Sequence, residues 1–319
     1  MARAKRLRLG VSACLLGQEV RYDGQHKRDP FVVDVLGKFA EWVPVCPELE
    51  IGMGVPREPI RLVGSAAGPR LVAERSGKDH TDAMIRFAEA RVRELATLDL
   101  DGYVTKKDSP SCGLLRVRVH AARGGPPRRE GVGLFVQVLA ARMPLLPIEE
   151  EGRLCDGALR ESFIERIFAH ARWKAAVARG MRRGDLVAFH TAHKLVLMAH
   201  SPAAYRALGS LVGGLAKGSI ARTVEAYGRR FMEALRVPAT RGRHANVLQH
   251  MLGTFRDVLP PPDRTELADV VADYARGLVP LVVPLTLFRH HVRSRGVAFL
   301  AGQTYLDPDP KELMLLNRA

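Results

Sequence analysis

The stretch LRLGVSACLLGQEVRYDG (residues 7–24) joins an apolar segment to a polar, charged loop, with a cysteine between them. Residues 7–11 have the composition of a buried β-strand, and Cys14 follows where that strand should end. The same order occurs twice more, since Cys46 ends the apolar segment 42–45 and Cys112 follows the segment 102–105 after a short loop. The position of these three thiols relative to the strands is the main clue to the fold and to the function.

The first half of the chain alternates strand-like and helix-like segments. This alternation predicts a Rossmann-like α/β domain whose parallel sheet is covered by helices on both faces. Residues 59–74 instead predict a hairpin inserted in that sheet, and residues 122–131 a flexible basic loop. The expected strands are 6–11, 42–45, 60–63, 71–74, 102–105 and 145–149, and the expected helices are 79–97 and 131–141.

From about residue 159 onward the strand signals stop and helical periodicity takes over. The expected helices are 159–179, 185–200, 202–211, 219–235, 244–259 and 265–278, with Gly and Pro at the joints. The sequence therefore predicts an α/β domain over residues 1–155 and an all-helical domain over residues 156–319. A length of 319 residues agrees with about two domains.

The composition favours a cytoplasmic protein with reduced thiols. Hydrophobic residues make up 47% of the chain, and no apolar run approaches the roughly 18 residues that a membrane span needs. Residues 1–17 faintly resemble a lipoprotein signal, but Arg8 interrupts their short apolar run. Four widely separated cysteines without a secretory signal indicate metal ligands or nucleophiles rather than a disulfide scaffold.

The charge is strongly positive and unevenly distributed. The net charge is +15 and the isoelectric point about 10.2. Residues 156–319 contain 24 Lys or Arg and 14 Asp or Glu, and thus +10 of the total, together with eight of the 11 His. A polyanionic partner such as nucleic acid is one explanation, and a solvated basic surface is the plainer one.

The three cysteines at strand ends should converge. In an open parallel sheet, the carboxyl ends of the strands share one edge, and ligands bind in the crevice there. Three thiolates suit a metal site in which one coordination position stays open. Either zinc or an iron–sulfur cluster could occupy such a site, and the spacing of the cysteines alone does not decide between them. The alternative is that each cysteine is simply a small buried residue. We expect no such role for Cys155 at the domain junction.

Three segments resemble the signatures of the thiouracil desulfurase family. They are VSACLLGQEVRYDG (11–24), CPELEIGMGVPREPIRL (46–62) and KKDSPSCG (106–113). The resemblance implies that Cys14, Cys46 and Cys112 hold a [4Fe-4S] cluster, whose open iron takes the sulfur of a thiocarbonyl base. It also implies acid/base and substrate-positioning roles for Glu48 and Ser109.

The chemistry that follows is a hydrolysis without net electron transfer. Coordination of the thiocarbonyl sulfur polarises the C=S bond, so that water can attack the carbon. Glu48 would take the proton from that water, and Ser109 would hydrogen-bond the base or relay a proton. Arg21, Asp23, Asp108 and Ser111 are weaker candidates that could shape the pocket. Without the cysteines, Glu48 and Ser109 would fit a helix start and a turn. We expect no nucleotide cofactor.

The helical half offers candidates for phosphate binding. His190, His193 and His200 share one face of a predicted helix, with Lys194 beside them. The spacing of His190 and His193 is also a weak metal signal, but a basic face that binds phosphate fits better. The candidate RNA-binding residues are His190, His193, Lys194, Arg229, Arg230, Arg243, His244, Arg289 and His290.

The segments 189–201, 243–251 and 283–291 resemble a helical domain found fused behind desulfurase domains. That resemblance implies removal of sulfur from 4-thiouridine in tRNA, with the helical domain binding the RNA. Two other hypotheses stay open. One is desulfuration of free thiobases, and the other is a non-enzymatic iron–sulfur regulator that binds nucleic acid. The sequence does not indicate the oligomeric state.

Overall fold

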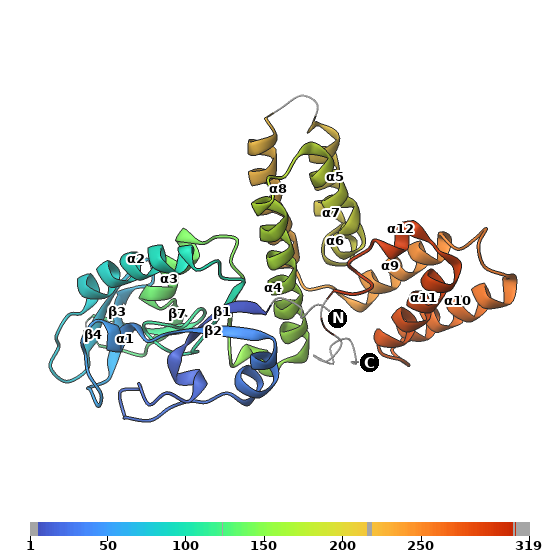
Figure 1. Cartoon of the computed structure of the whole chain (residues 1–319). Helices are drawn as coiled ribbons and strands as arrows, with labels where there is room; N and C mark the ends of the chain where they lie inside the picture. The colour runs from blue at the N-terminus through green and yellow to red at the C-terminus, as the bar shows by residue number, and fades with distance from the viewer. Residues whose placement is uncertain (1–5, 123, 216–218, 309, 311–319) are drawn as a thin grey trace. The chain divides into compact units, whose positions relative to one another are not determined.

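The computed structural model describes residues 6–122, 124–215, 219–308 and 310 (Figure 1). The chain divides into two compact units, residues 1–156 and residues 157–319. The described residues include no helix that is long and apolar enough to cross a bilayer.

The first unit contains a four-stranded sheet in which every strand is parallel to its neighbours. Its order is β2 (Ala40–Val45), β1 (Leu7–Ser12), β5 (Gly102–Thr105) and β8 (Ile148–Glu150). This arrangement confirms the predicted parallel sheet. β1 lies in the middle because Leu7, Leu9 and Val11 are fully or almost fully buried, as an interior strand requires.

The predicted hairpin is present, but it belongs to a second sheet. β3 (Ile60–Ser65) and β4 (Gly68–Ala73) are antiparallel, and β3 also pairs with β6 (Val117–His120). β7 (Arg128–Gly131) completes this sheet in the order β4, β3, β6, β7. The placement of the hairpin within the parallel sheet was therefore wrong. β7 occupies part of the segment expected as a flexible loop, of which residue 123 lies outside the described residues.

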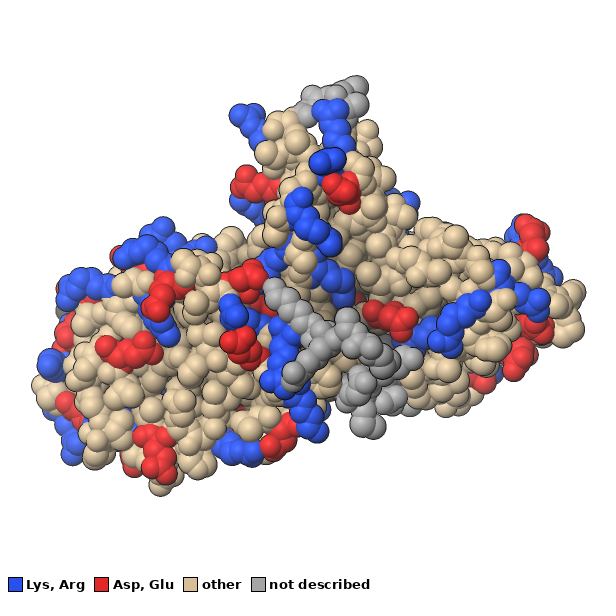
Figure 2. Space-filling model, in the orientation of Figure 1, with Lys and Arg blue, Asp and Glu red and all other residues tan. Residues whose placement is uncertain are grey.

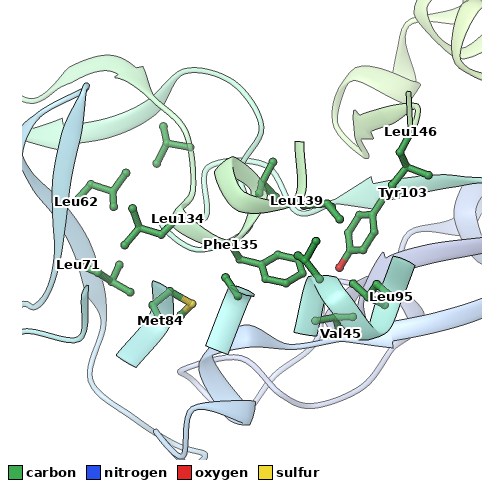
Figure 3. Close-up of a cluster of buried hydrophobic side chains, with 14 of the residues drawn as sticks. Val45, Leu62, Leu71, Met84, Leu95, Tyr103, Leu134, Phe135, Leu139 and Leu146 are labelled. Atoms are coloured by element: carbon green, nitrogen blue, oxygen red, sulfur yellow. The ribbon is translucent and has the colours of Figure 1, made fainter. Parts of the chain in front are cut away.

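Two helices lie together against the sheets and close the core of the first unit. They are α2 (Thr81–Thr97) and α3 (Leu134–Arg142), whose apolar faces meet Tyr103 of β5 (Figure 3). A Cβ on Gly10 would lie 2.2 Å from the Tyr103 ring, so only glycine lets this ring lie across β1. Short helices fill the connections: η1 (Ala13–Leu16), η2 (Phe31–Val35), η3 (Leu36–Lys38), α1 (Pro47–Glu50) and η4 (Arg153–Cys155).

The described residues of the second unit form helices joined by loops and include no strand, which confirms the predicted all-α region. The helix expected over 185–200 is broken at His193, and α11 and α12 were not predicted. The helices are α4 (Gly157–Ala178), α5 (Arg183–Ala192), α6 (Lys194–His200), α7 (Pro202–Gly213), α8 (Ile220–Leu235), α9 (Arg241–Gly253), α10 (Pro261–Arg276), α11 (Val282–Arg295) and α12 (Ala298–Ala301).

An aromatic cluster forms part of the core of the helical unit. The ring centroid of Trp173 lies 5.1 Å from that of Phe189 and 5.4 Å from that of Tyr227. Gly228 allows this approach, because a Cβ there would lie 2.6 Å from the Trp173 ring. α8 therefore packs against α4 with its backbone in contact with the indole.

Candidate metal centre and its carboxylate

The three cysteines predicted to converge line one cavity of about 500 Å³ in the first unit. Cys14 lies in η1 directly after β1, Cys46 directly follows β2, and Cys112 lies in the loop after β5. The parallel sheet brings these three strand ends to one edge, which is why residues so distant in sequence meet. All three thiols are free, as is Cys155, which is exposed and does not line the cavity.

The environment of the thiols suits a cationic centre. Burial raises the pKa of the Cys14 thiol to about 11, with Lys106 opposing this effect. Burial also raises the pKa of Cys46 and of Cys112, and the charges of Glu48 and Cys46 add to the effect on Cys112. In the metal-free protein the thiols are therefore protonated, and a bound metal would supply the positive charge that stabilises their thiolates.

The donor set fits a metal group that prefers sulfur. Thiolates are the usual ligands of iron–sulfur clusters and are common ligands of zinc. Among the described residues, no three His, Cys, Asp or Glu side chains are placed to hold a single metal ion. Cys14, Cys46 and Cys112, which line one cavity, are the residues that could hold a metal group such as a cluster.

The Cys112 loop is fixed by the first turn of α3. The amides of Leu134 and Phe135 donate to the carbonyl oxygens of Pro110 and Ser111, at 3.2 and 3.1 Å. A Cβ on Gly133 would lie 2.4 Å from the carbonyl oxygen of Ser111 and 2.7 Å from the amide nitrogen of Cys112. The helix start thus holds the main chain of the cysteine loop by direct contact.

A carboxylate lies at the same cavity. Glu48 is in α1, and its Oε1 accepts a hydrogen bond of 2.6 Å from the Ser111 hydroxyl. Its Oε2 accepts from Nε and Nη2 of Arg57, at 3.2 and 2.5 Å. The Arg57 side chain is only 4% exposed and the Glu48 side chain 15%. The two hydrogen bonds from Arg57 fix the Glu48 carboxylate in a nearly closed environment.

Arg57 also joins the carboxylate to the loop after η1. Its Nη1 and Nη2 each donate to the carbonyl oxygen of Val20 at 3.1 Å, and its Nη1 donates to that of Gly54 at 2.9 Å. The amide of Arg57 donates to the carbonyl oxygen of Tyr22. Sequence reasoning missed this role of Arg57. The residue lies within the second signature segment, but nothing in the sequence shows that its guanidinium turns inward.

The Ser109 hydroxyl lies further from the Glu48 carboxylate than the Ser111 hydroxyl does. The Ser109 hydroxyl oxygen accepts from the amides of Cys112 and Ser111, at 3.1 and 3.3 Å, and so fixes the turn. It lies 3.0 Å from the Ser111 hydroxyl and 3.5 Å from Glu48 Oε1. Because a carboxylate only accepts, the hydroxyl protons run from Ser109 to Ser111 to Glu48. The structure thus gives Ser111, a weaker sequence candidate, the direct contact.

The remaining candidates of the first unit are divided between the cavity and its surroundings. Arg21 and Asp108 line the cavity, whereas Asp23 does not and instead pairs with Arg21 at 3.3 Å. Asp108 pairs with Arg129 at 3.1 Å. Cationic residues outnumber anionic ones in the cavity lining, which includes Lys27, Arg61, Lys106, Lys107 and Arg118. The cavity therefore favours an electron-rich or anionic ligand.

Two of the residues expected to bind RNA are packing residues. His190 is 4% exposed and bonds to the Tyr227 hydroxyl, and His193 is 2% exposed and bonds to the carbonyl oxygen of Phe189. Burial lowers the pKa of both, that of His193 to about 3. These two assignments are corrected, because both imidazoles lie in the core, where burial disfavours their charged form.

The other RNA-binding candidates of the helical unit fall into two groups: some side chains contact other parts of the unit, and others lie at its surface. Arg243 donates to the carbonyl oxygen of His200, and Arg289 donates to that of Leu306 and pairs with Asp307. His244 bonds to the Tyr305 hydroxyl, and burial lowers its pKa to about 4. The candidates at the surface are Arg229, which pairs with Glu225, together with Arg230, His290 and the half-buried Lys194.

Comparison with known proteins matches each unit to a different family. Residues 9–151 match the family model described as 2-thiouracil desulfurase, and residues 194–310 match that of a protein family of unknown function, DUF1722. The chain is 33% identical over 156 residues to the uncharacterized protein YbgA of Escherichia coli K12, which corresponds to 49% of this chain and 92% of YbgA.

Two further relatives are similar to parts of the chain. The uncharacterized protein YbbK of Bacillus subtilis 168 is 31% identical over 108 residues, which are 32% of this chain and 71% of YbbK. A solved structure, that of the [4Fe-4S]-dependent thiouracil desulfidase TudS, is 32% identical and covers 50% of this chain and all of its own, with a TM-score of 0.40. The chain belongs to the 2-thiouracil desulfurase family and carries a DUF1722 domain behind the desulfurase domain.

Proposed function

We propose that this protein removes sulfur from 4-thiouridine in tRNA and leaves uridine, using a [4Fe-4S] cluster held by Cys14, Cys46 and Cys112. The observation that carries the proposal is the cavity that Cys14, Cys46 and Cys112 line together with Glu48. Membership of a desulfurase family and the likeness to TudS, which is described as [4Fe-4S]-dependent, support it.

The reaction is balanced without a redox partner. Water adds oxygen to the carbon, the C=S bond breaks, and sulfur leaves as sulfide, so that no electrons are gained or lost overall. When bound, the cluster supplies a soft Lewis acid for the thiocarbonyl sulfur. The protein contributes a carboxylate at the cavity and a preformed hydrogen-bond chain.

Glu48 is placed to accept the proton from the attacking water. Arg57 holds one of its oxygens and Ser111 donates to the other, so the carboxylate is oriented before substrate arrives. The proton that Glu48 accepts would then pass to the departing sulfur, which regenerates the carboxylate, while Ser111 and Ser109 keep the carboxylate oriented. Buried polar groups of this kind lose little orientation freedom during the reaction.

The choice of tRNA rests on the charge of the helical unit. Residues 156–319 carry a net charge of +10, and α8 presents Arg222, Arg229 and Arg230 at its surface. Lys and Arg side chains follow the part of this unit that contains α4 and α8 (Figure 2). Cationic contacts to phosphate would supply affinity, and the thiolated base would have to leave its stack to enter the cavity.

Anaerobic reconstitution tests the enzymatic proposal. The full chain, loaded with iron and sulfide, should abolish the near-ultraviolet absorbance of thiolated tRNA and release sulfide in equal amount. Cys112→Ser should lose the cluster and the activity, whereas Cys155→Ser is the matched control because its thiol is exposed and does not line the cavity. A fully loaded wild type that releases no sulfide would reject the proposal.

Salt dependence tests the RNA partner. The double variant Arg222→Gln/Arg230→Gln should weaken tRNA binding and reduce the slope of log K against log salt by about 1.5, since each lost phosphate contact accounts for about 0.7–0.9. The control, Arg75→Gln/Arg86→Gln, removes the same charge from exposed positions of the α/β unit. Equal slopes for the two double variants would refute this surface.

The same assays separate the alternatives. Desulfuration of free thiobases predicts turnover of free thiouracil and no salt-dependent binding of tRNA. A non-enzymatic regulator predicts that Glu48→Ala leaves all measurable function intact. Loss of sulfide release with retained tRNA binding in Glu48→Ala would favour the tRNA desulfurase.

A further inference from the structure

The cavity that contains the cysteines also reaches the second sheet. Cys14 and Cys46 follow strands of the parallel sheet, whereas Arg61 of β3 and Arg118 of β6 line the same cavity from the other sheet. The volume of about 500 Å³ lies in the range of pockets that hold a drug-sized ligand. The cavity thus joins a wall that carries cysteines to a wall that carries two guanidinium groups, called here the arginine pair.

The two members of the arginine pair are neighbours on adjacent strands. β3 and β6 are parallel, with Leu62 opposite Val119, so the residues that precede these two, Arg61 and Arg118, lie side by side. Neighbouring strands are only about 4.8 Å apart. Like charges placed opposite each other on such strands destabilise the sheet, and an anion bound by both would relieve their repulsion.

The arginine pair has unused hydrogen-bond donors. The Nε of Arg61 is buried and forms no hydrogen bond among the described residues, and Arg118 is exposed. A buried donor without an acceptor costs free energy, because it has given up water and gained nothing in return. A ligand oxygen at Arg61 would remove this cost.

The carboxylates of the cavity do not neutralise the arginine pair. Glu48 is paired with Arg57, and Asp108 is paired with Arg129. Glu74 also lines the cavity, but within the described part of the chain no ion pair joins it to either arginine. The positive charge of this wall is therefore left for a ligand.

Two adjacent guanidinium groups suit a phosphate. Each presents planar N–H donors that match the oxygens of a phosphate in pairs, and each keeps its charge at every pH at which proteins fold. A free thiobase carries no phosphate and would leave the arginine pair without an acceptor. A nucleotide, in contrast, carries a phosphate on the ribose attached to its base.

We propose that Arg61 and Arg118 form a phosphate subsite of the cavity, so that the substrate is a nucleotide, free or within RNA, and not a free base. The inference rests on the proposed function for the place of the base, which lies at the cysteines while its ribose phosphate lies at the arginine pair. Selection of the substrate thus begins in the α/β unit itself.

The test compares ligands that differ only in the phosphate. The reconstituted full chain is titrated by calorimetry with uridine and with uridine 5′- and 3′-monophosphate. We expect a preference of about 10–100-fold for a monophosphate over uridine, as is typical of hydrogen bonds to a charged group. Arg61→Gln and Arg118→Gln should each lose most of this preference. The matched control is Arg70→Gln, which removes an exposed charge from β4 without touching the cavity.

The outcomes separate the subsite from the desulfurase reaction. A wild type that binds neither monophosphate better than uridine overturns the subsite, even if it releases sulfide from thiolated tRNA. A clear preference in a loaded chain that releases no sulfide instead rejects the proposed function.

A second measurement covers the case in which Arg61→Gln does not fold. Arg118 is exposed, so Arg118→Gln should fold, and a preference equal to that of wild type in this variant overturns the subsite. Turnover distinguishes the two sources of the phosphate. A raised KM of Arg118→Gln for thiolated tRNA assigns the phosphate to RNA, and a raised KM for 4-thiouridine monophosphate alone assigns it to the free nucleotide.

Discussion

Replacing Arg57 by Met tests whether the buried pair with Glu48 organises the cavity. The substitution keeps most of the side-chain volume but removes every donor to Glu48, Val20 and Gly54. It leaves a carboxylate that is only 15% exposed without its cationic partner. Two main-chain carbonyl groups lose a donor at the same time.

The expected destabilisation is large for a single polar substitution. Removal of one partner of a buried ion pair typically costs about 3–5 kcal/mol, because the other charge stays buried. The slight exposure of Glu48 places the expected value near the lower limit, at about 3 kcal/mol. For a unit of 156 residues this corresponds to a decrease in Tm of roughly 6–12 °C.

Urea unfolding of the metal-free chain measures this free energy, and the fluorescence of Trp42 reports on the α/β unit once Trp173 is replaced by Phe. The control is Arg28→Met, which breaks the surface pair with Asp34 and should cost at most about 1 kcal/mol. The double variant Glu48→Gln/Arg57→Met should be more stable than Arg57→Met, because it leaves no buried charge. Equal costs for Arg57→Met and Arg28→Met, or a double variant no more stable than Arg57→Met, would refute the reasoning.

Three further substitutions probe the base, the cysteine loop and the buried histidines. Glu48→Gln should lower turnover by about 10²–10⁴-fold with an unchanged iron content, because it removes the general base and keeps the shape. Gly133→Ala should cost about 1–3 kcal/mol and lower the iron content, since its Cβ would meet the main chain of Ser111. Between pH 6.5 and about 3, the unfolded chain binds a proton at His193 that the folded chain does not. Protonation of His193 in the unfolded chain should therefore reduce the free energy of unfolding by up to about 1.4 kcal/mol for each pH unit below 6.5. His193→Gln should abolish this contribution to the pH dependence of stability.

Gly68→Ala is the matched control for Gly133→Ala. Gly68→Ala should change stability by less than about 0.5 kcal/mol, because a Cβ there has open space. Unfolding of the helical unit is followed through Trp173 after Trp42 is replaced by Phe. Wild-type turnover in Glu48→Gln, normal iron content in Gly133→Ala, or an unchanged pH dependence in His193→Gln would each contradict the corresponding assignment.

The sequence predicts the parallel sheet well because its strands are short, apolar and bounded by turn residues. It fails for β6 and β7, where segments such as RREG (128–131) carry more charge than an ordinary strand. The partner of the predicted hairpin could not be foreseen for the same reason. The pairing of two strands depends on which sheet edge is free, and the periodicity of one segment contains no information about the edges of other strands.

The candidate site was also predicted only in part from the sequence. The cysteines follow from the rule that parallel strand ends share an edge, so their convergence in one cavity could be predicted. The inward turn of Arg57 and the direct contact of Ser111 with Glu48 depend on side-chain packing that spacing does not encode. The histidine face was read as basic, although the same spacing describes a buried face equally well, and only the burial of His190 and His193 distinguishes the two.

The main chain of each ligand candidate is fixed by its own hydrogen bonds. The carbonyl oxygen of Cys14 accepts from the amides of Gly17 and Lys27, the amide of Cys46 donates to Glu50, and that of Cys112 donates to Ser109. Small zinc domains fold only when metal is bound, because nothing else orders their ligands. Here hydrogen bonds within the sheet and its loops hold the main chain of each cysteine, so we expect a cluster to lose little affinity to the ordering of its ligands.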